Sequence, residues 1–138
     1  MERIHENIAG KTLKAENQHL DEFDLLRSRL NLLEGKDKVL MTMYIENGNS
    51  FRQIARLLNI SDTRVARRIH RLTKGLTGGD YINCLRHRDK FTGHQMNIAR
   101  DFFLLGLSIR RIAAKRRRSR YFIHETIVRI QRYMKNSA

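Results

Sequence analysis

Apolar residues recur at helical spacing between residues 35 and 76. They return every three to four positions, as one buried face of a helix requires. The apolar positions fall in three runs, which are Val39, Leu40, Met43 and Tyr44, then Ile54, Leu57 and Leu58, and then Val65, Ile69 and Leu72. This pattern predicts three short helices whose apolar faces turn inward.

Polar residues mark where these helices start and stop. Residues 47–49 (Asn-Gly-Asn) suit the left-handed backbone that often ends a helix. Ser50 suits a helix N-cap, and Gln53 three positions later completes a capping box. Ser61 suits the N-cap of the third helix. The sequence therefore predicts the helix boundaries as well as the helices.

The segment between the second and third helices has the composition of a helix–turn–helix. Ala55 is small enough to let the third helix cross closely. Asn59 lies at the turn, where a left-handed conformation is needed, and Ile60 is expected to point into the core. We therefore expect one helix–turn–helix unit over residues 35–76.

A second copy of this pattern follows 58 positions later. Residues 33–72 align on residues 91–130 without a gap. The matching positions are glycines, helix caps and core residues, namely Gly35 and Gly93, Gly48 and Gly106, Ser50 and Ser108, Arg52 and Arg110, Ile54 and Ile112, Ala55 and Ala113, Ser61 and Ser119, and Ile69 and Ile127. The repeat predicts an all-α protein built from tandem trihelical helix–turn–helix units.

The remaining segments complete the predicted organisation. An apolar stripe predicts an additional N-terminal helix from about Asp21, either packed under the first unit or presented to a partner. The stripe consists of Phe23, Leu26, Leu30 and Leu33. Residues 1–20 are polar, and we expect them to fray. The expected domains are 1–34 (polar segment and amphipathic helix), 35–76 (first unit), 77–90 (linker with a short helical turn) and 91–138 (second unit).

The charge is large and unevenly placed. The 138 residues include 28 Lys and Arg against 14 Asp and Glu, a net charge of +14. Residues 1–34 carry a net −2 and residues 35–138 a net +16. Arginine outnumbers lysine by 20 to 8, and its planar fork matches phosphates and guanine edges. The charge favours a polyanionic partner over a merely solvated surface.

Several classes of protein find little support. The longest apolar run, 102–107, is too short to span a bilayer, and the N-terminus does not resemble a signal peptide. A lone cysteine, Cys84, excludes an internal disulfide, and with His87 and His94 it falls short of a closed zinc site. No phosphate loop or catalytic triad is evident. We expect no enzyme, cofactor or metal, and a cytoplasmic protein that is nucleoid-associated if bacterial.

The third helix of the first unit has a polar face suited to the major groove of DNA. With Val65 turned inward, Thr63, Arg67, His70, Arg71 and Lys74 are expected near the opposite face. We expect base contacts from Arg67 and His70. We expect backbone contacts from Arg64, Arg71 and Lys74 and, on the second helix, from Arg52 and Gln53.

The second unit departs from the first at its turn. Where the first has residues 58–60 (Leu-Asn-Ile), the second has Arg116, Arg117 and Arg118. Either the arginine stems pack and their charges reach solvent, or the turn is remodelled. The basic run from residue 115 to 120 suits phosphates, with a disordered loop or a nuclear-localisation patch as alternatives. The outward face of the following helix holds Tyr121, His124, Glu125, Val128, Arg129 and Arg132, which suit either bases or a protein partner.

The stretch from residue 39 to 76, VLMTMYIENGNSFRQIARLLNISDTRVARRIHRLTKGL, resembles region 4 of bacterial sigma-70 family factors. The resemblance lies in the apolar helix ending at Tyr44, the opening of the second helix at 50–55, and residues 60–65 with the arginine-rich tail that follows. It implies reading of a promoter element in the major groove, contact with RNA polymerase, and DNA contacts at Arg64, Arg67, Arg68 and Arg71. Nothing resembles region 2, so a complete sigma factor is not expected.

Three functions remain open. The leading hypothesis is a sequence-specific regulator that reads adjacent major-groove sites of double-stranded DNA with two helix–turn–helix units. The alternatives are a sigma-like adaptor that binds RNA polymerase and the DNA-binding part of a recombinase or transposase. Besides the residues above, the predicted DNA-binding set includes Ser61, Arg110, Arg111, Ser119 and Arg120.

Overall fold

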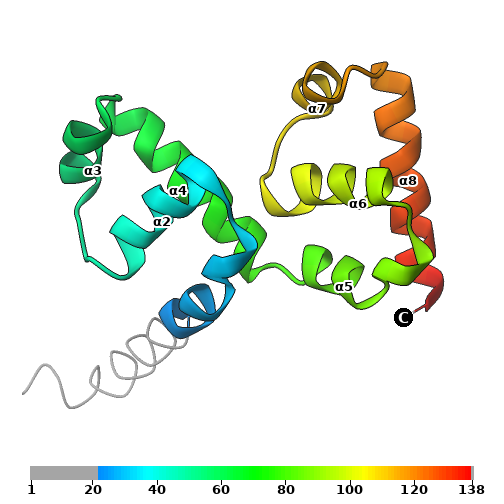
Figure 1. The fold of residues 1–138 in the computed structure, drawn as a ribbon, viewed down its shortest axis with the longest axis horizontal. Coiled ribbons are helices and arrows are strands. Elements are labelled where there is room, and N and C mark those ends of the chain that lie inside the picture. Colours follow the sequence, from blue (N-terminus) through cyan, green and yellow to red (C-terminus); the bar gives the residue numbers. More distant parts are fainter. Residues whose placement is uncertain (1–21, 138) are drawn as a thin grey trace, which may run out of the picture. The chain divides into compact units, whose positions relative to one another are not determined.

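A computed structural model describes residues 22–137, and within this range the chain forms helices and turns with no strand (Figure 1). The all-α fold predicted from the sequence is confirmed. By their contacts, the residues divide into two compact units, Met1–Asn59 and Ile60–Ala138. The predicted fraying of residues 1–20 lies outside the described residues. Our expected domain boundaries differ from this division, which falls inside the first turn, and they stay a prediction.

The compact unit that ends at Asn59 contains three consecutive helical segments after a short N-terminal helix. Residues 22–29 are helical, and η1 (Leu30–Leu32), α2 (Gly35–Ile45) and α3 (Phe51–Leu58) follow. The predicted N-terminal stripe is buried at three of its four positions, and Phe23 is half-buried. The buried residues of the unit are Leu26, Leu30, Leu33, Leu40, Met41, Ile45, Ile54 and Ala55. The stripe therefore contributes to the core, which is the first of our two alternatives for it.

Leu57 does not point inward as the apolar pattern predicts. Its side chain is 67% exposed, and Leu58 is only half-buried. The eight-residue helix α3 buries Ile54 and Ala55. Leu57 lies two positions after Ala55, which at 3.6 residues per turn is roughly 200° away, on the far side of the helix. The inward prediction for Leu57 is wrong because the sequence showed only that it was apolar.

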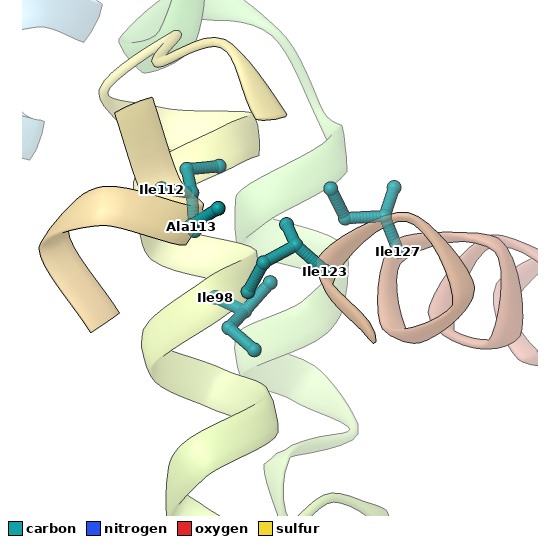
Figure 2. Close-up of a cluster of buried hydrophobic side chains, with 5 residues drawn as sticks. All are labelled: Ile98, Ile112, Ala113, Ile123 and Ile127. Atoms are coloured by element: carbon teal, nitrogen blue, oxygen red, sulfur yellow. The ribbon is translucent and has the colours of Figure 1, made fainter. Parts of the chain in front are cut away.

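The compact unit that starts at Ile60 begins with a long helix and ends with another. Its elements are α4 (Asp62–Thr77), α5 (Asp80–Arg86), η2 (Arg88–Lys90), α6 (Gly93–Ala99), the π-helical η3 (Arg100–Leu104), α7 (Ile109–Arg116) and α8 (Arg120–Ser137). Figure 2 shows one apolar cluster of this unit, in which α6, α7 and α8 meet. The cluster contains Ile98, Ile112, Ala113, Ile123 and Ile127. Ile112, Ala113 and Ile127 are the residues that the repeat matched to Ile54, Ala55 and Ile69 of the first copy.

The segment expected as a linker is largely ordered helix. Between residues 77 and 90 the chain forms α5 and η2, joined to α4 through Gly78 and Gly79. Tyr81 and Cys84 are buried, and α5 contacts α4, η3, α6 and α8. The short turn that we expected is therefore a packed helix of seven residues. Glycines before it and charged residues after it concealed its two buried positions in the sequence.

The two turns that we compared in the sequence have matching local geometry. Helices α3 and α7 each contain eight residues, and α7 starts 58 positions after α3. Gly48 and Gly106 both have a φ of +66°, while Asn59 and Arg117 both have a φ of 56°. The segment before the second turn differs, because α6 changes into the π-helical η3 where α2 continues as an α-helix.

Candidate nucleic-acid interface

Helix α4 is fixed at its start by a cap and along its length by an apolar stripe. The hydroxyl oxygen of Ser61 accepts a hydrogen bond from the backbone N–H of Arg64 at 3.2 Å. The side chains of the stripe are buried, and they are Val65, Ile69, Leu72 and Leu76. Because Ser61 already serves as the N-cap, its predicted contact with DNA would have to use its remaining hydrogen-bonding capacity.

The opposite face of α4 is exposed and basic. Four of the residues predicted there, Thr63, Arg67, His70 and Lys74, are exposed to solvent, as is Arg64 on the flank. Within α4, Asp62 is the one acidic residue, and it lies in the first turn. A helix with this composition presents a positive surface with donors that can reach phosphates and base edges. The structure thus gives the predicted recognition face the exposure that DNA contact requires.

Arg71 and Arg68 are less open than the prediction assumed. Both are half-buried, and the aliphatic stem of Arg71 lies against Gly106, in the turn after η3. At 3.6 residues per turn, Arg71 lies roughly 130° from the centre of the buried stripe, whereas Arg67 and Lys74 lie nearly opposite it. Arg71 and His70 therefore flank the outward face at equal angles on its two sides, and of the two it is Arg71 that is half-buried.

At the start of α3, one predicted contact residue is held by a capping box. The backbone N–H of Ser50 donates to Oε1 of Gln53 at 2.9 Å, and the backbone N–H of Gln53 donates to the hydroxyl of Ser50 at 3.1 Å. This reciprocal pair is the arrangement that the sequence predicted. Arg52 beside it is exposed. The box leaves the amide NH₂ of Gln53 as the group suited to a phosphate oxygen.

A buried carboxylate, which was not predicted from the sequence, binds part of the basic run of residues 115–120. The side chain of Asp101 in η3 is fully buried, and it accepts from Nζ of Lys115 at 2.8 Å. It also accepts two hydrogen bonds from Arg116, from Nε at 2.7 Å and from the terminal nitrogen at 3.1 Å. Asp101 neutralises part of the basic run from within the fold. Arg116 was predicted as a phosphate contact, but its guanidinium is occupied by Asp101.

The next two arginines have separate structural roles. Arg117 occupies the left-handed position of the turn, with its side chain exposed. The guanidinium carbon of Arg118 lies 4.6 Å from the ring centroid of Phe122, a cation–π contact. Arg116 fits neither of our two alternatives, because its half-buried side chain pairs with the buried Asp101 and its charge does not reach solvent, whereas Arg118 is exposed. The backbone of Arg117 has the same left-handed conformation as that of Asn59 in the first turn, so the second turn is not remodelled at this position.

Helix α8 is capped by a serine, as α4 is. The hydroxyl oxygen of Ser119 accepts from the backbone N–H of Phe122 at 3.0 Å, so this predicted DNA contact also serves as an N-cap. Tyr121 is 75% exposed, and Val128 is half-buried. The other predicted contacts of α7 and α8 that are exposed are Arg110, Arg111, Arg120, His124, Arg129 and Arg132. This face contains Glu125 as well, so it is less uniformly basic than that of α4.

Other chemistry has little basis in the described part of the chain. Burial raises the pKa of the Cys84 thiol to about 11, and the nearby carboxylate of Asp80 adds to the shift. At neutral pH this thiol is protonated and poorly nucleophilic. Among residues 22–137, no three His, Cys, Asp or Glu side chains are grouped so that they could hold a metal ion. Over the same range, each helix is too short or too polar to cross a bilayer.

Comparison with known proteins agrees with the geometry of the first turn. Residues 23–74 match the family model described as Sigma-70, region 4. The match extends the resemblance seen in the sequence back to residue 23, so that it includes the N-terminal stripe. It supports a DNA-binding helix–turn–helix in this segment. No curated protein and no solved structure matches the chain.

Proposed function

We propose that this protein is a sequence-specific regulator of transcription that binds double-stranded DNA with two helix–turn–helix units. In this proposal α4 lies in the major groove, where Arg67 and His70 contact base edges and Thr63 lies beside them. Arg64 and Lys74 contact phosphates, which supply affinity without sequence information. The family match at residues 23–74 supports the DNA-binding role of the first turn.

One observation carries the proposal most directly. The residues assigned to bases and phosphates are exposed, while the residues one half-turn away are buried, with Val65 fully inaccessible and Ile69 3% exposed. A helix can insert into a groove only if its apolar side is already packed in the protein and its polar side is open. Helix α4 meets both conditions.

For the second turn we propose a similar role with a narrower set of contacts. Because Asp101 binds Lys115 and Arg116, and Arg118 stacks on Phe122, phosphate contact falls to Arg117, Arg120 and the exposed arginines of α7. We assign the exposed Tyr121 to contact with a thymine methyl group. The matching local geometry of the two turns supports the tandem arrangement.

Selection from a pool of random duplexes at two salt concentrations tests this function. The wild-type protein should recover one consensus containing two half-sites. Arg67→Ala should make one base position of the consensus degenerate, because a bidentate contact to a base is worth about 1–3 kcal/mol of discrimination. Arg88→Ala removes the same charge from the exposed η2 and should leave the consensus unchanged. Enrichment without any consensus would refute sequence-specific reading.

A second candidate function is an adaptor that binds RNA polymerase, and the family match gives it a specific basis. The exposed apolar residues Val39, Phe51 and Leu57 of the first unit are suited to a protein partner. Capture of purified RNA polymerase by the wild-type protein, with loss of capture by Leu57→Gln, would favour this function. DNA binding that needs no polymerase, with no capture at any protein concentration, would exclude it.

A further inference from the structure

Helix α4 approaches η3 so closely that one position between them must be glycine. A Cβ atom added to Gly75 would overlap the backbone carbonyl oxygen of Leu104 and stand 2.7 Å from its carbonyl carbon. Backbone cannot yield here as a flexible side chain could. Glycine within a helix costs about 1 kcal/mol relative to alanine, so its presence in α4 has a structural purpose. That purpose is the direct contact of α4 with the backbone of η3.

A second contact lies one helical turn earlier on α4. The stem of Arg71 packs against Gly106, whose φ is +66°, and a Cβ there would stand 2.9 Å from Cδ of Arg71. The same turn is held to η3, because the backbone N–H of Leu107 donates to the carbonyl of Asp101 at 2.9 Å. The Asp101 carboxylate in turn binds α7. A continuous series of contacts therefore runs from α4 through η3 to α7.

These contacts add to those of α5, which itself packs against α4, η3 and α8, in holding the joint that follows α4. The chain leaves α4 through Gly78 and enters α5 from Gly79, and two successive glycines alone leave the backbone free to rotate. A groove of about 480 Å³ adjoins these contacts, and Gly75, Lys74 and Phe102 help to line it. Gly75 and Arg71 are the two residues of α4 that make these contacts, and we name them the clamp.

We propose that the clamp fixes the distance between the DNA contacts of α4 and those of α8, so that the protein accepts paired half-sites at a single spacing. This inference rests on the proposed function, in which both helices bind DNA. Two binding surfaces on one rigid body can be occupied together only when their targets are separated by the matching distance. Gly75 is then a positioning residue for specificity, although it contacts no base.

The spacing rule is tested with wild-type protein and duplexes that carry both selected half-sites. The spacer is kept at the selected length or extended by two, five or ten base pairs. We expect each extension to weaken binding by about a hundredfold, to the affinity of a single half-site, because the second contact is lost. The ten-pair extension restores the helical face but not the distance, so a flexible joint would tolerate it.

Each outcome of this experiment bears on a different claim. If the affinities were equal within about twofold across the spacers and both half-sites were protected in footprints, the spacing rule would be overturned. The proposal that two helix–turn–helix units bind DNA would remain. A selection that returns only a single half-site would overturn that proposal itself, and the spacing rule with it.

The role of Gly75 is tested by Gly75→Ala with Gly93→Ala as the matched control. A Cβ on Gly93 meets nothing within 4 Å, so that variant should keep the full spacing dependence. Gly75→Ala should bind a single half-site as the wild type does, while the loss on the five-pair extension shrinks to less than about tenfold. Circular dichroism establishes that both variants fold. A folded Gly75→Ala protein with unchanged spacing dependence would contradict the clamp.

Discussion

Asp101 shows how one side chain decides what a run of basic residues can do. Lys115, Arg116 and Arg118 look equivalent in the sequence, yet two of them share a fully buried carboxylate and the third covers an aromatic ring. A buried carboxylate is tolerable only with such partners, because its desolvation must be offset by charge-assisted hydrogen bonds. The fold therefore determines which of these basic side chains remain available to contact DNA.

Replacing Asp101 by asparagine should destabilise the protein while keeping the shape of the side chain. We expect the free energy of unfolding in urea to fall by about 2 kcal/mol, because hydrogen bonds to two charged partners lose their ionised acceptor. Asp24→Asn removes an exposed pair with Arg27 and should change stability by less than about 0.5 kcal/mol. Equal effects of the two substitutions would show that the buried ion pairs contribute nothing.

Arg117 should be replaceable by glycine with a gain in stability. Its left-handed backbone costs about 1 kcal/mol for a residue with a Cβ, and glycine removes that cost. Arg129→Gly is the matched control, because it lies inside α8 and should lose about 1 kcal/mol. Urea denaturation measures both changes, and a destabilised Arg117→Gly would mean that the arginine side chain stabilises the turn.

At the scale of elements, the eight-residue helix α3 carries both a fully buried apolar side chain, Ile54, and a highly exposed one, Leu57. Ile54→Ala should lower the free energy of unfolding by about 3 kcal/mol, since it leaves a cavity at a fully buried position. Leu57→Gln, three positions later, should change it by less than about 0.5 kcal/mol. Thermal or urea unfolding compares the two. A large loss in Leu57→Gln would show that this side chain is covered in the folded protein.

Features of these elements could be predicted from the sequence when the interacting residues lie close together along the chain. Caps and turns depend on residues a few positions apart, so the box of Ser50 and Gln53 and the left-handed Asn59 were predictable. The ion pairs of Asp101 join residues 14 and 15 positions apart in the chain, and helical periodicity carries no signal for them. The repeat aligns Arg117 with Asn59, but arginine does not itself favour a left-handed backbone, so the sequence left a remodelled turn open.

For the whole molecule, the net charge of +14 predicts binding that weakens steeply as salt is added. Lys74→Ala should weaken binding to all duplex sequences alike and reduce the slope of log affinity against log salt by about 0.9, the effect of one lost phosphate contact. Fluorescence anisotropy over a salt series measures the slope. An unchanged slope would remove Lys74 from the interface.

The central claim is that the exposed face of α4 reads bases, and the ratio of affinities for the selected and a scrambled duplex tests it most directly. The wild-type ratio should be large, and in the double variant Arg67→Ala with His70→Ala it should fall by about tenfold or more, while binding to the scrambled duplex changes little. A double variant that keeps the wild-type ratio would show that another surface of the protein reads the sequence.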